Sequence, residues 1–193
     1  LSSEIVLDKL LATLMKIAIE NAGAQKGYLL LQNEAGQWSI EAEGRIDTEE
    51  VAIGQSQAID NNASNAIINY VARTQKSVVL ADAAKEGQFT RDAYILATKA
   101  NSILCTPLVN QGKLSGILYL ENNLATGAFT RERTRILQVL SGQAAIAIDN
   151  ARLYERLENY SRQLESYSRN LEEKVEERTA QLAEATREAK AAN

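Results

Sequence analysis

Apolar residues recur at alternating steps of three and four along the last forty or so residues of the chain. The repeating positions are Leu153, Leu157, Tyr160, Leu164, Tyr167, Leu171 and Val175. This spacing is typical of the seam of a coiled coil, in which helices cover one another's apolar stripe. Since no Gly or Pro follows Gly142, we predict one continuous helix from about Arg131 to the end of the chain.

The seam predicts a parallel homodimer and contains one irregularity. The steps from Tyr167 to Leu171 and from Leu171 to Val175 are both four residues long, which is a stutter that locally unwinds a supercoil. Leu182 continues the stripe more weakly. Because Tyr160 and Tyr167 place polar-tipped rings in the seam, we expect a coil of modest stability.

The residues before this seam predict one domain of mixed helices and strands. Helical periodicity covers residues 4–22 and 65–74. Short apolar or alternating segments, which predict strands, cover residues 26–32, 37–43, 51–53, 77–80, 102–109 and 114–121. Turns are predicted at 33–36 and 110–113, residues 86–94 are interpreted as a loop that leads into a short helix, and Thr130 is placed to cap the long helix. We therefore divide the chain into a domain of residues 1–150 and a coiled coil of residues 151–193.

Composition and charge narrow the classes of function. The chain is 45% hydrophobic and 24% charged, with a formal net charge of -4. No apolar run approaches the roughly twenty residues of a membrane span, and one cysteine permits no intrachain disulfide, so we expect a cytoplasmic location. Acidic and basic residues are interspersed, which argues against a nucleic-acid partner.

The sequence lacks the residues that most catalytic sites use. It contains no His, so it has no phosphoacceptor histidine, no histidine-based nucleophile relay and no His ligand for haem. A single cysteine cannot build a zinc site, and the glycines do not have P-loop spacing. We expect no catalytic and no metal-binding residues in this chain.

A series of motifs, in order, resembles those of GAF domains. The matching residues are Gly27-Tyr28-Leu29-Leu30-Leu31, then 102–108, 112–122, Phe129-Thr130 and 140–154. The segment 171–182 is similar to the signalling helix that joins sensor domains to histidine kinase cores, and residues 190–193 look like the last ones before a phosphoacceptor helix. The resemblance implies a sensor upstream of a kinase domain in the same polypeptide.

Membership of that family implies an α+β fold and limits the cofactors. The fold is a six-stranded antiparallel sheet, with the first and last helices on one face and a ligand pocket under short helices on the other. Bilin-binding relatives attach the tetrapyrrole through a cysteine commonly followed by His, whereas Cys105 is followed by Thr106, which argues against a covalent bilin. Asn122-Asn123 with Phe129 and Glu132 matches the cyclic-nucleotide pattern poorly, and sulfoxide-reducing relatives need several cysteines.

The resemblance also suggests ligand-pocket candidates. They are Tyr28, Trp38, Arg91, Asp92, Tyr94, Cys105, Tyr119 and Glu121. Tyr28 and Trp38 could stack on a planar ligand, although aromatic residues in strands are more often core. Arg91, Asp92 and Tyr94 lie where the family places a helix over its pocket. Cys105 is expected to be a buried structural residue rather than a redox-sensing thiol.

These features predict a regulatory module rather than an enzyme. We expect a dimeric GAF domain to pass a change in its pocket, or in its dimer packing, along the coiled coil to a histidine kinase. The family binds many unrelated molecules, so the resemblance implies a pocket without specifying its ligand. Two alternatives remain open: a ligand-free dimerisation spacer, and the sensor of a diguanylate cyclase.

Overall fold

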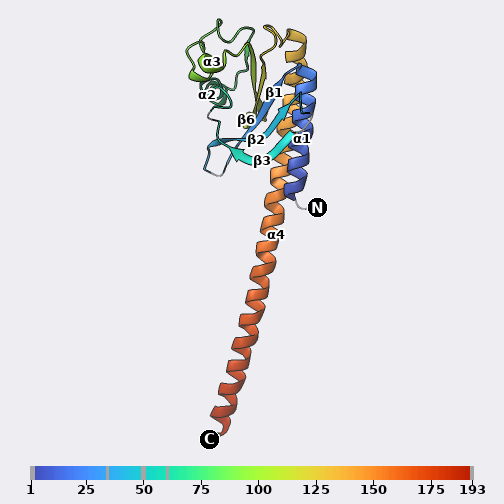
Figure 1. The fold of residues 1–193 in the computed structure, drawn as a ribbon. Coiled ribbons are helices and arrows are strands. Elements are labelled where there is room, and N and C mark those ends of the chain that lie inside the picture. Colours follow the sequence, from blue (N-terminus) through green and yellow to red (C-terminus); the bar gives the residue numbers. More distant parts are fainter. Residues whose placement is uncertain (1–2, 34, 49–50, 60, 192–193) are drawn as a thin grey trace. The chain divides into compact units, whose positions relative to one another are not determined.

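The structure is a computed structural model that describes residues 3–33, 35–48, 51–59 and 61–191. In chain order (Figure 1), its elements are α1 (Ser3–Ala22), β1 (Lys26–Gln32), β2 (Trp38–Arg45), β3 (Val51–Gln57), α2 (Asn65–Thr74), β4 (Val78–Leu80), α3 (Ala93–Thr98), β5 (Ser102–Asn110), β6 (Lys113–Asn122) and α4 (Arg131–Ala191). Glu34 of the predicted turn at 33–36, and the predicted chain end at 192–193, lie outside the described residues.

All of these strands form one antiparallel sheet with the order β3-β2-β1-β6-β5-β4. The prediction of a six-stranded antiparallel sheet is confirmed. Strand β3 is longer than predicted, because its main-chain pairing with β2 continues past Ile53 to Gln57, which lies opposite Ile40. The added residues are polar or glycine, so the apolar pattern does not detect them.

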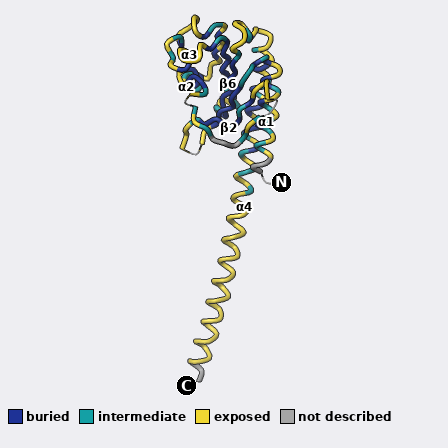
Figure 2. Tube along the Cα trace, in the orientation of Figure 1, coloured by how far each residue is buried: buried dark blue, intermediate teal, exposed yellow. Residues whose placement is uncertain are grey.

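The two central strands, β1 and β6, send alternate side chains to opposite faces of the sheet. On the face that we call the α1/α4 face, Leu29, Leu31, Leu118 and Leu120 pack with buried residues of helices α1 and α4. Figure 2 shows these strands as the most buried part of the fold. The predicted packing of the first and last helices on one face is confirmed.

The opposite face, which we call the α2/α3 face, holds a second apolar cluster. Tyr28, Leu30, Ile117 and Tyr119 pack there with residues of the short helices α2 and α3. Helix α2 begins at a Ser64 cap, whose hydroxyl accepts a hydrogen bond from the backbone of Ile67. The sheet thus separates a layer of long helices from a layer of short ones.

Two glycines let α1 approach the sheet closely. Gly27 of β1 and Gly44 of β2 are cross-strand partners on the α1/α4 face. A Cβ added at Gly44 would lie 2.6 Å from both Ile19 Cδ1 and Met15 Cγ, and one added at Gly27 would lie 2.9 Å from the sulfur of Met15. Met15 therefore fills space that exists only because neither strand residue has a side chain.

The chain divides into two compact units, one ending at Arg152 and the other beginning at Leu153. Helix α4 contributes to both, which confirms the predicted long C-terminal helix. Its N-terminus is capped as expected, since the backbone N–H of Arg133 donates to the Thr130 hydroxyl at 3.4 Å.

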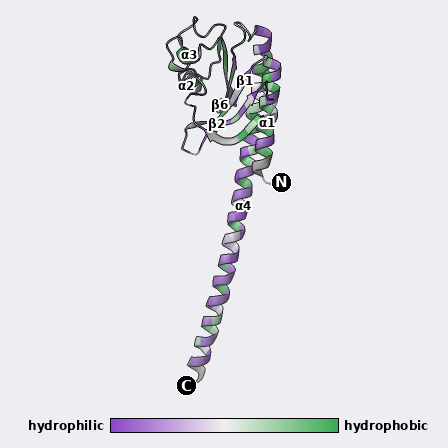
Figure 3. Ribbon diagram, in the orientation of Figure 1, coloured by the Kyte–Doolittle hydropathy of each residue, from purple (hydrophilic) through white to green (hydrophobic). Residues whose placement is uncertain are grey.

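In the second unit, every residue of the predicted seam is exposed in the single chain, with exposed fractions between 51% and 69%. Figure 3 shows hydrophobic positions recurring along an otherwise mostly hydrophilic stretch of this helix. The flanks carry charged pairs, of which Arg162 Nη2 lies 2.7 Å from Glu158 Oε1. An exposed apolar stripe with solvated flanks is the pattern that a partner helix would cover.

Candidate functional site

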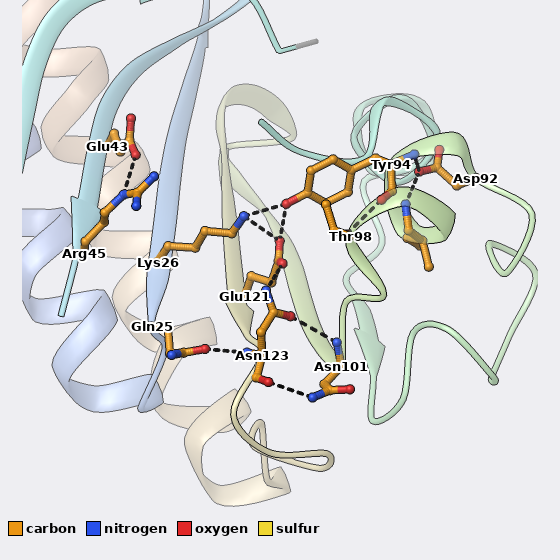
Figure 4. Close-up of polar contacts among 11 residues, drawn as sticks. Gln25, Lys26, Glu43, Arg45, Asp92, Tyr94, Thr98, Asn101, Glu121 and Asn123 are labelled. Atoms are coloured by element: carbon orange, nitrogen blue, oxygen red, sulfur yellow. Dashed lines mark hydrogen bonds and ion pairs between the residues drawn. The ribbon is translucent and has the colours of Figure 1, made fainter. Parts of the chain in front are cut away.

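Cross-strand register brings a polar group to one end of the two central strands. Lys26 lies opposite Glu121, and Tyr28 lies opposite Tyr119, in the antiparallel pairing of β1 with β6. Residues two apart in a strand share a face, so all four of these side chains belong to the α2/α3 face. Figure 4 shows Lys26 and Glu121 converging on a residue of α3.

That residue is Tyr94. Its hydroxyl donates a hydrogen bond of 2.8 Å to Glu121 Oε2 and accepts one of 2.5 Å from Lys26 Nζ. The same ammonium lies 3.3 Å from Glu121 Oε2, and Asn123 Nδ2 donates to Glu121 Oε1 at 2.6 Å. We call Lys26, Tyr94, Glu121 and Asn123 the polar cluster. It fully satisfies a carboxylate that has no exposed surface.

Local capping fixes the helix that presents Tyr94. The Asp92 carboxylate accepts hydrogen bonds from the backbone N–H groups of Tyr94 and Ile95, at 3.0 and 3.2 Å. Thr98 donates back to the carbonyl of Tyr94, and Lys99 ends the helix in the left-handed conformation. Asp92 was a candidate for ligand recognition, and the structure gives its carboxylate the role of helix cap.

The end of β6 is held by hydrogen bonds on both faces of the sheet. The side-chain oxygen of Asn123 accepts a hydrogen bond from the backbone N–H of Asn101 at 3.1 Å, and the backbone N–H of Asn123 donates to Gln25 Oε1 at 2.6 Å. Its neighbour Asn122 donates to the carbonyl of Gly23, just after α1, at 2.8 Å. Asn122 and Asn123 therefore connect the end of the first helix with the polar cluster through consecutive residues.

An aromatic pair lies beside the polar cluster. The rings of Tyr28 and Tyr119 have centroids 6.3 Å apart, and Lys26 Nζ lies 5.8 Å from the Tyr28 centroid and 5.3 Å from that of Tyr94. Both distances are within the range of cation–π attraction. The lysine thus has contacts with two rings as well as with a carboxylate.

Burial and the charge of Glu121 make these phenols hard to ionise. Burial is the largest cause and raises the pKa of Tyr28 to about 12, with Glu43 and Glu121 acting in the same direction. The pKa values of Tyr94 and Tyr119 are also raised, first by burial and then by the negative charge of Glu121. The three hydroxyls therefore stay protonated and can donate hydrogen bonds at neutral pH.

The Tyr119 hydroxyl is fully buried and makes no hydrogen bond within the described residues. The Ser64 backbone lowers the pKa of Tyr119 somewhat without forming a well-aligned hydrogen bond to the hydroxyl. A buried donor without a partner costs about 1–3 kcal/mol. Such a group is rare in a folded domain and calls for a role.

Of the eight predicted pocket residues, the structure brings Tyr28, Tyr94, Tyr119 and Glu121 together. Trp38 pairs with Gln32 at the other end of β1, so it lies apart from the polar cluster.

Arg91 and Cys105 have contrasting surroundings. The Arg91 side chain is exposed. Cys105 is buried opposite Tyr119, and burial raises the pKa of its thiol, which disfavours the reactive thiolate.

Two residues of the polar cluster, Lys26 and Asn123, were not among the predicted site residues. The signal that could have found Lys26 is strand alternation, because it lies two residues from Tyr28 in β1, whereas Asn123 follows the last residue of β6 and carries no such signal. The contact of Lys26 with α3 depends on strand register, which the local pattern does not specify.

A separate groove of about 280 Å³ lies on the α1 side of the fold, away from the polar cluster. It is lined by Lys16, Ile19, Glu20, Arg45, Ile46 and Val51. Its ionic side chains are engaged with neighbours: Lys16 lies 4.0 Å from Glu20, and Arg45 lies 2.9 Å from Glu43. The groove contains none of the predicted site residues.

Within the described residues, no helix is long and apolar enough to cross a membrane. In the same part of the chain, no three His, Cys, Asp or Glu side chains are grouped as a metal site would require.

Comparison with known proteins gives two histidine kinases among the relatives. The chain is 40% identical over 102 residues to hybrid signal transduction histidine kinase G of Dictyostelium discoideum, a match that covers 53% of this chain and 3% of that protein. It is 24% identical over 160 residues to the peroxide stress-activated histidine kinase mak3 of Schizosaccharomyces pombe, covering 81% of this chain and 7% of mak3. The chain thus spans only a small part of each relative.

Solved structures and a family model agree on the fold. The GAF domain of an Acinetobacter phosphoenolpyruvate-protein phosphotransferase matches with a TM-score of 0.59 and 20% identity, over 79% of this chain and 86% of that one. The third GAF domain of Slr1393 from Synechocystis matches with a TM-score of 0.58 and 15% identity, over 78% and 98%. The family model for the GAF domain matches residues 6–148. The chain therefore belongs to the GAF domain family.

Proposed function

We propose that this chain is the sensor and dimerisation module of a cytoplasmic signal-transducing histidine kinase. The observation that carries the proposal is the 40% identity to a hybrid histidine kinase over about half of the chain. The chain itself contains no His, so its part in phosphotransfer is regulatory and the kinase core belongs to another part of the polypeptide. Since both relatives named above are histidine kinases, we favour a kinase output over a cyclase.

The ligand step of the proposal rests on the polar cluster and on Tyr119. In the structure, Tyr94 donates to Glu121, which is the hydrogen bond that an incoming ligand would replace. The unpartnered Tyr119 hydroxyl offers a second hydrogen bond beside it. We infer a small ligand that donates to the Glu121 carboxylate and accepts from Tyr119, with the Tyr28 ring beside it.

Helix α4 is the proposed output element. Within the domain it contributes Leu137, Ala144, Ala145 and Ile148 to the cluster on the α1/α4 face. Further along, its exposed seam pairs with a second copy in a parallel coiled coil. A ligand that favours one packing of the sheet against α4 would thereby favour one arrangement of the two helices and one state of the kinase.

A ligand-free spacer is the second candidate, and one observation favours it. Tyr28, Tyr94 and Tyr119 are all buried, so their rings already occupy much of the α2/α3 face. In this alternative the tyrosines are core residues and the chain only dimerises and spaces its neighbours.

Native mass spectrometry of the freshly purified chain, compared with the 21.2 kDa monomer mass, separates the two candidates. A dimer with a reproducible adduct supports ligand sensing, and Tyr119→Phe should lose that adduct while remaining folded. A dimer without an adduct favours the spacer. A monomer at micromolar concentration contradicts both candidates.

Activity of the full-length protein provides an independent measurement. We expect Tyr119→Phe to change the rate of autophosphorylation from ATP, with Tyr70→Phe as a control on the same face that keeps the rate of the parent protein. Equal rates for both variants would contradict a sensing role for Tyr119.

A further inference from the structure

We propose that the turns of two β-hairpins form a clasp on α4, which fixes the helix at the point where it leaves the GAF domain and thereby sets the resting state of the kinase. The clasp consists of Gln32 and Asn110 in the hairpins, and of Asp149 and Arg152 in α4. The inference rests on the proposed role of α4 as the output element and names the residues that control it.

Both hairpin turns lie at the end of the sheet opposite the polar cluster. Strand β1 ends at Gln32, and β5 turns into β6 between Asn110 and Lys113. Since Leu30 of β1 lies opposite Ile117 in antiparallel β6, the end of β1 is close to the start of β6. Two turns that are far apart in the sequence therefore lie at the same end of the sheet.

Each turn has a defined backbone. In the first, the backbone N–H of Asn33 donates to the carbonyl of Gln37, whose own N–H donates to Asn33 Oδ1, both at 2.9 Å. In the second, Gln111 and Gly112 have φ angles of 49° and 79°, as a tight hairpin turn requires. The hairpins therefore present their hydrogen-bonding groups in fixed positions.

Each hairpin makes one hydrogen bond to the last turn of α4 within the domain. Arg152 Nη2 donates to the carbonyl of Gln32 at 2.9 Å, and Asn110 Nδ2 donates to Asp149 Oδ2 at 2.8 Å. Because residues three apart are neighbours on the surface of a helix, Asp149 and Arg152 face the sheet end together. The second compact unit begins at the next residue, Leu153.

The apolar contacts of α4 weaken where the clasp forms. Ile148 is fully buried in the cluster on the α1/α4 face, whereas Ala151 offers only a methyl group and is the last buried residue in the described part of α4. A methyl group makes few contacts, so the two hydrogen bonds determine how the helix is rotated as it leaves the domain. Asn110 and Asp149 are only partly buried, so water can replace their bond and the clasp can open without unfolding the domain.

The turn between β5 and β6 also contacts helix α2. Gln75, the left-handed residue that ends α2, donates from Nε2 to the carbonyl of Gly112 at 3.4 Å. Helix α2 packs Ile67 and Val71 into the cluster on the α2/α3 face. A shift of α2 on that face therefore reaches Asp149 through the turn, which gives the clasp a way to open.

A charge placed in the clasp tests it in the 193-residue chain. Asn110→Asp sets two carboxylates against each other, and we expect hydrogen exchange of the α4 backbone around Asp149 and Arg152 to become at least about threefold faster. The double variant Asn110→Asp and Asp149→Asn exchanges donor and acceptor, and should restore the exchange rate of the parent chain. Gln111→Asp makes the same change of charge at an exposed residue of the same turn and should leave exchange unchanged. Equal exchange in Asn110→Asp and this control contradicts the clasp.

The full-length protein tests whether the clasp acts on the kinase. We expect Asn110→Asp to change the rate of autophosphorylation from ATP at least about threefold, the double variant to restore it, and Gln111→Asp to keep it. Gln75→Glu removes the amide donor, keeps the shape of the side chain and should change the rate in the same direction as Asn110→Asp. Faster exchange without a change of rate contradicts the inference and leaves the proposed function intact, since α4 can carry the signal through other contacts. A parent protein that does not autophosphorylate contradicts the proposed function, and hydrogen exchange then decides the clasp by itself.

Discussion

Lys26 and Glu121 are cross-strand neighbours whose Nζ and Oε2 atoms lie 3.3 Å apart, and the same two atoms both contact the hydroxyl of Tyr94. The carboxylate is fully buried and the ammonium is partly exposed, so the lysine and the tyrosine together replace the water that Glu121 lost on folding. These contacts connect helix α3 to the two central strands, so we expect each of them to contribute to the free energy of unfolding.

Removing only the Tyr94 hydroxyl should therefore destabilise the domain. We expect Tyr94→Phe to lower the free energy of unfolding by about 1–3 kcal/mol, because Glu121 loses a buried hydrogen-bond donor. Urea denaturation followed by circular dichroism measures the change. Tyr70→Phe, on the neighbouring helix α2, is the matched control, and an equal loss in both variants would show that the Tyr94 hydroxyl contributes nothing specific.

Removing the charge of Lys26 should lower the free energy of unfolding more than removing the Tyr94 hydroxyl does. Lys26→Met leaves a buried carboxylate without its cation, and we expect a loss of about 3–5 kcal/mol. Adding Glu121→Gln to that variant should recover part of the loss, because the remaining amide is neutral. Additive effects of the two substitutions in a double-mutant cycle would contradict the coupling.

Two glycines in different surroundings, Gly44 under α1 and Gly142 in α4, predict stability changes of opposite sign on substitution by alanine. Gly44→Ala places a methyl group 2.6 Å from side-chain atoms of Met15 and Ile19, so we expect a loss of about 1–3 kcal/mol from overpacking. Gly142 lies inside α4 with nothing within 4 Å of an added Cβ, and Gly142→Ala should gain roughly 0.5–1 kcal/mol. Thermal denaturation of both variants checks the signs, and a stabilising Gly44→Ala would mean that α1 packs less closely than described.

Alkaline pH should lower the free energy of unfolding, because buried tyrosines hold their protons more tightly in the folded domain. Tyr28 binds its proton more tightly in the folded chain, with a pKa raised from 10.0 to about 12, so its contribution is complete below about pH 10 and is lost as pH rises through about 12. We expect the free energy of unfolding to fall over this interval. The fall should be shallower in Tyr28→Phe and unchanged in Tyr154→Phe, whose ring is exposed on α4.

Substitution of the two tyrosines in the tail seam should change signalling by the full-length protein. Replacing Tyr160 and Tyr167 with leucine should tighten the proposed coil and hold one helix register. If mass spectrometry identifies an adduct, we expect the autophosphorylation rate of the full-length variant to no longer respond to it. A normal response in this variant would count against a register switch.

Local patterns predicted most of the fold. The hairpin between β5 and β6 was predicted from a turn at Asn110-Gln111-Gly112-Lys113, and both central residues of that turn have positive φ angles, as the tight turn requires. Helix α2 was predicted with its observed bounds because its apolar residues recur at helical spacing. The sheet order and the far end of β3 depend on pairing between distant strands, so local patterns could not supply them, and the family resemblance implied six antiparallel strands without their order.

The candidate site was predicted only in part, for the same reason. Tyr94 and Glu121 are 27 residues apart, and their hydrogen bond exists because β5 and β6 pair and α3 packs over them. Lys26 resembles any solvated lysine at the start of a strand until it is placed opposite Glu121. Asp92 was proposed for ligand recognition, whereas its position just before a helix also fits the cap that the structure shows.

The hydrogen bonds at the end of β6 link helix α3 and the end of helix α1 through three consecutive residues. Glu121 and Asn123 hold the polar cluster, and Asn122 between them holds the carbonyl of Gly23, where α1 has just ended. A movement of α3 that displaces Glu121 would therefore reach the end of α1 through adjacent residues. Replacing Asn122 should break this link at the Gly23 carbonyl and leave the contact of Glu121 with Tyr94 in place.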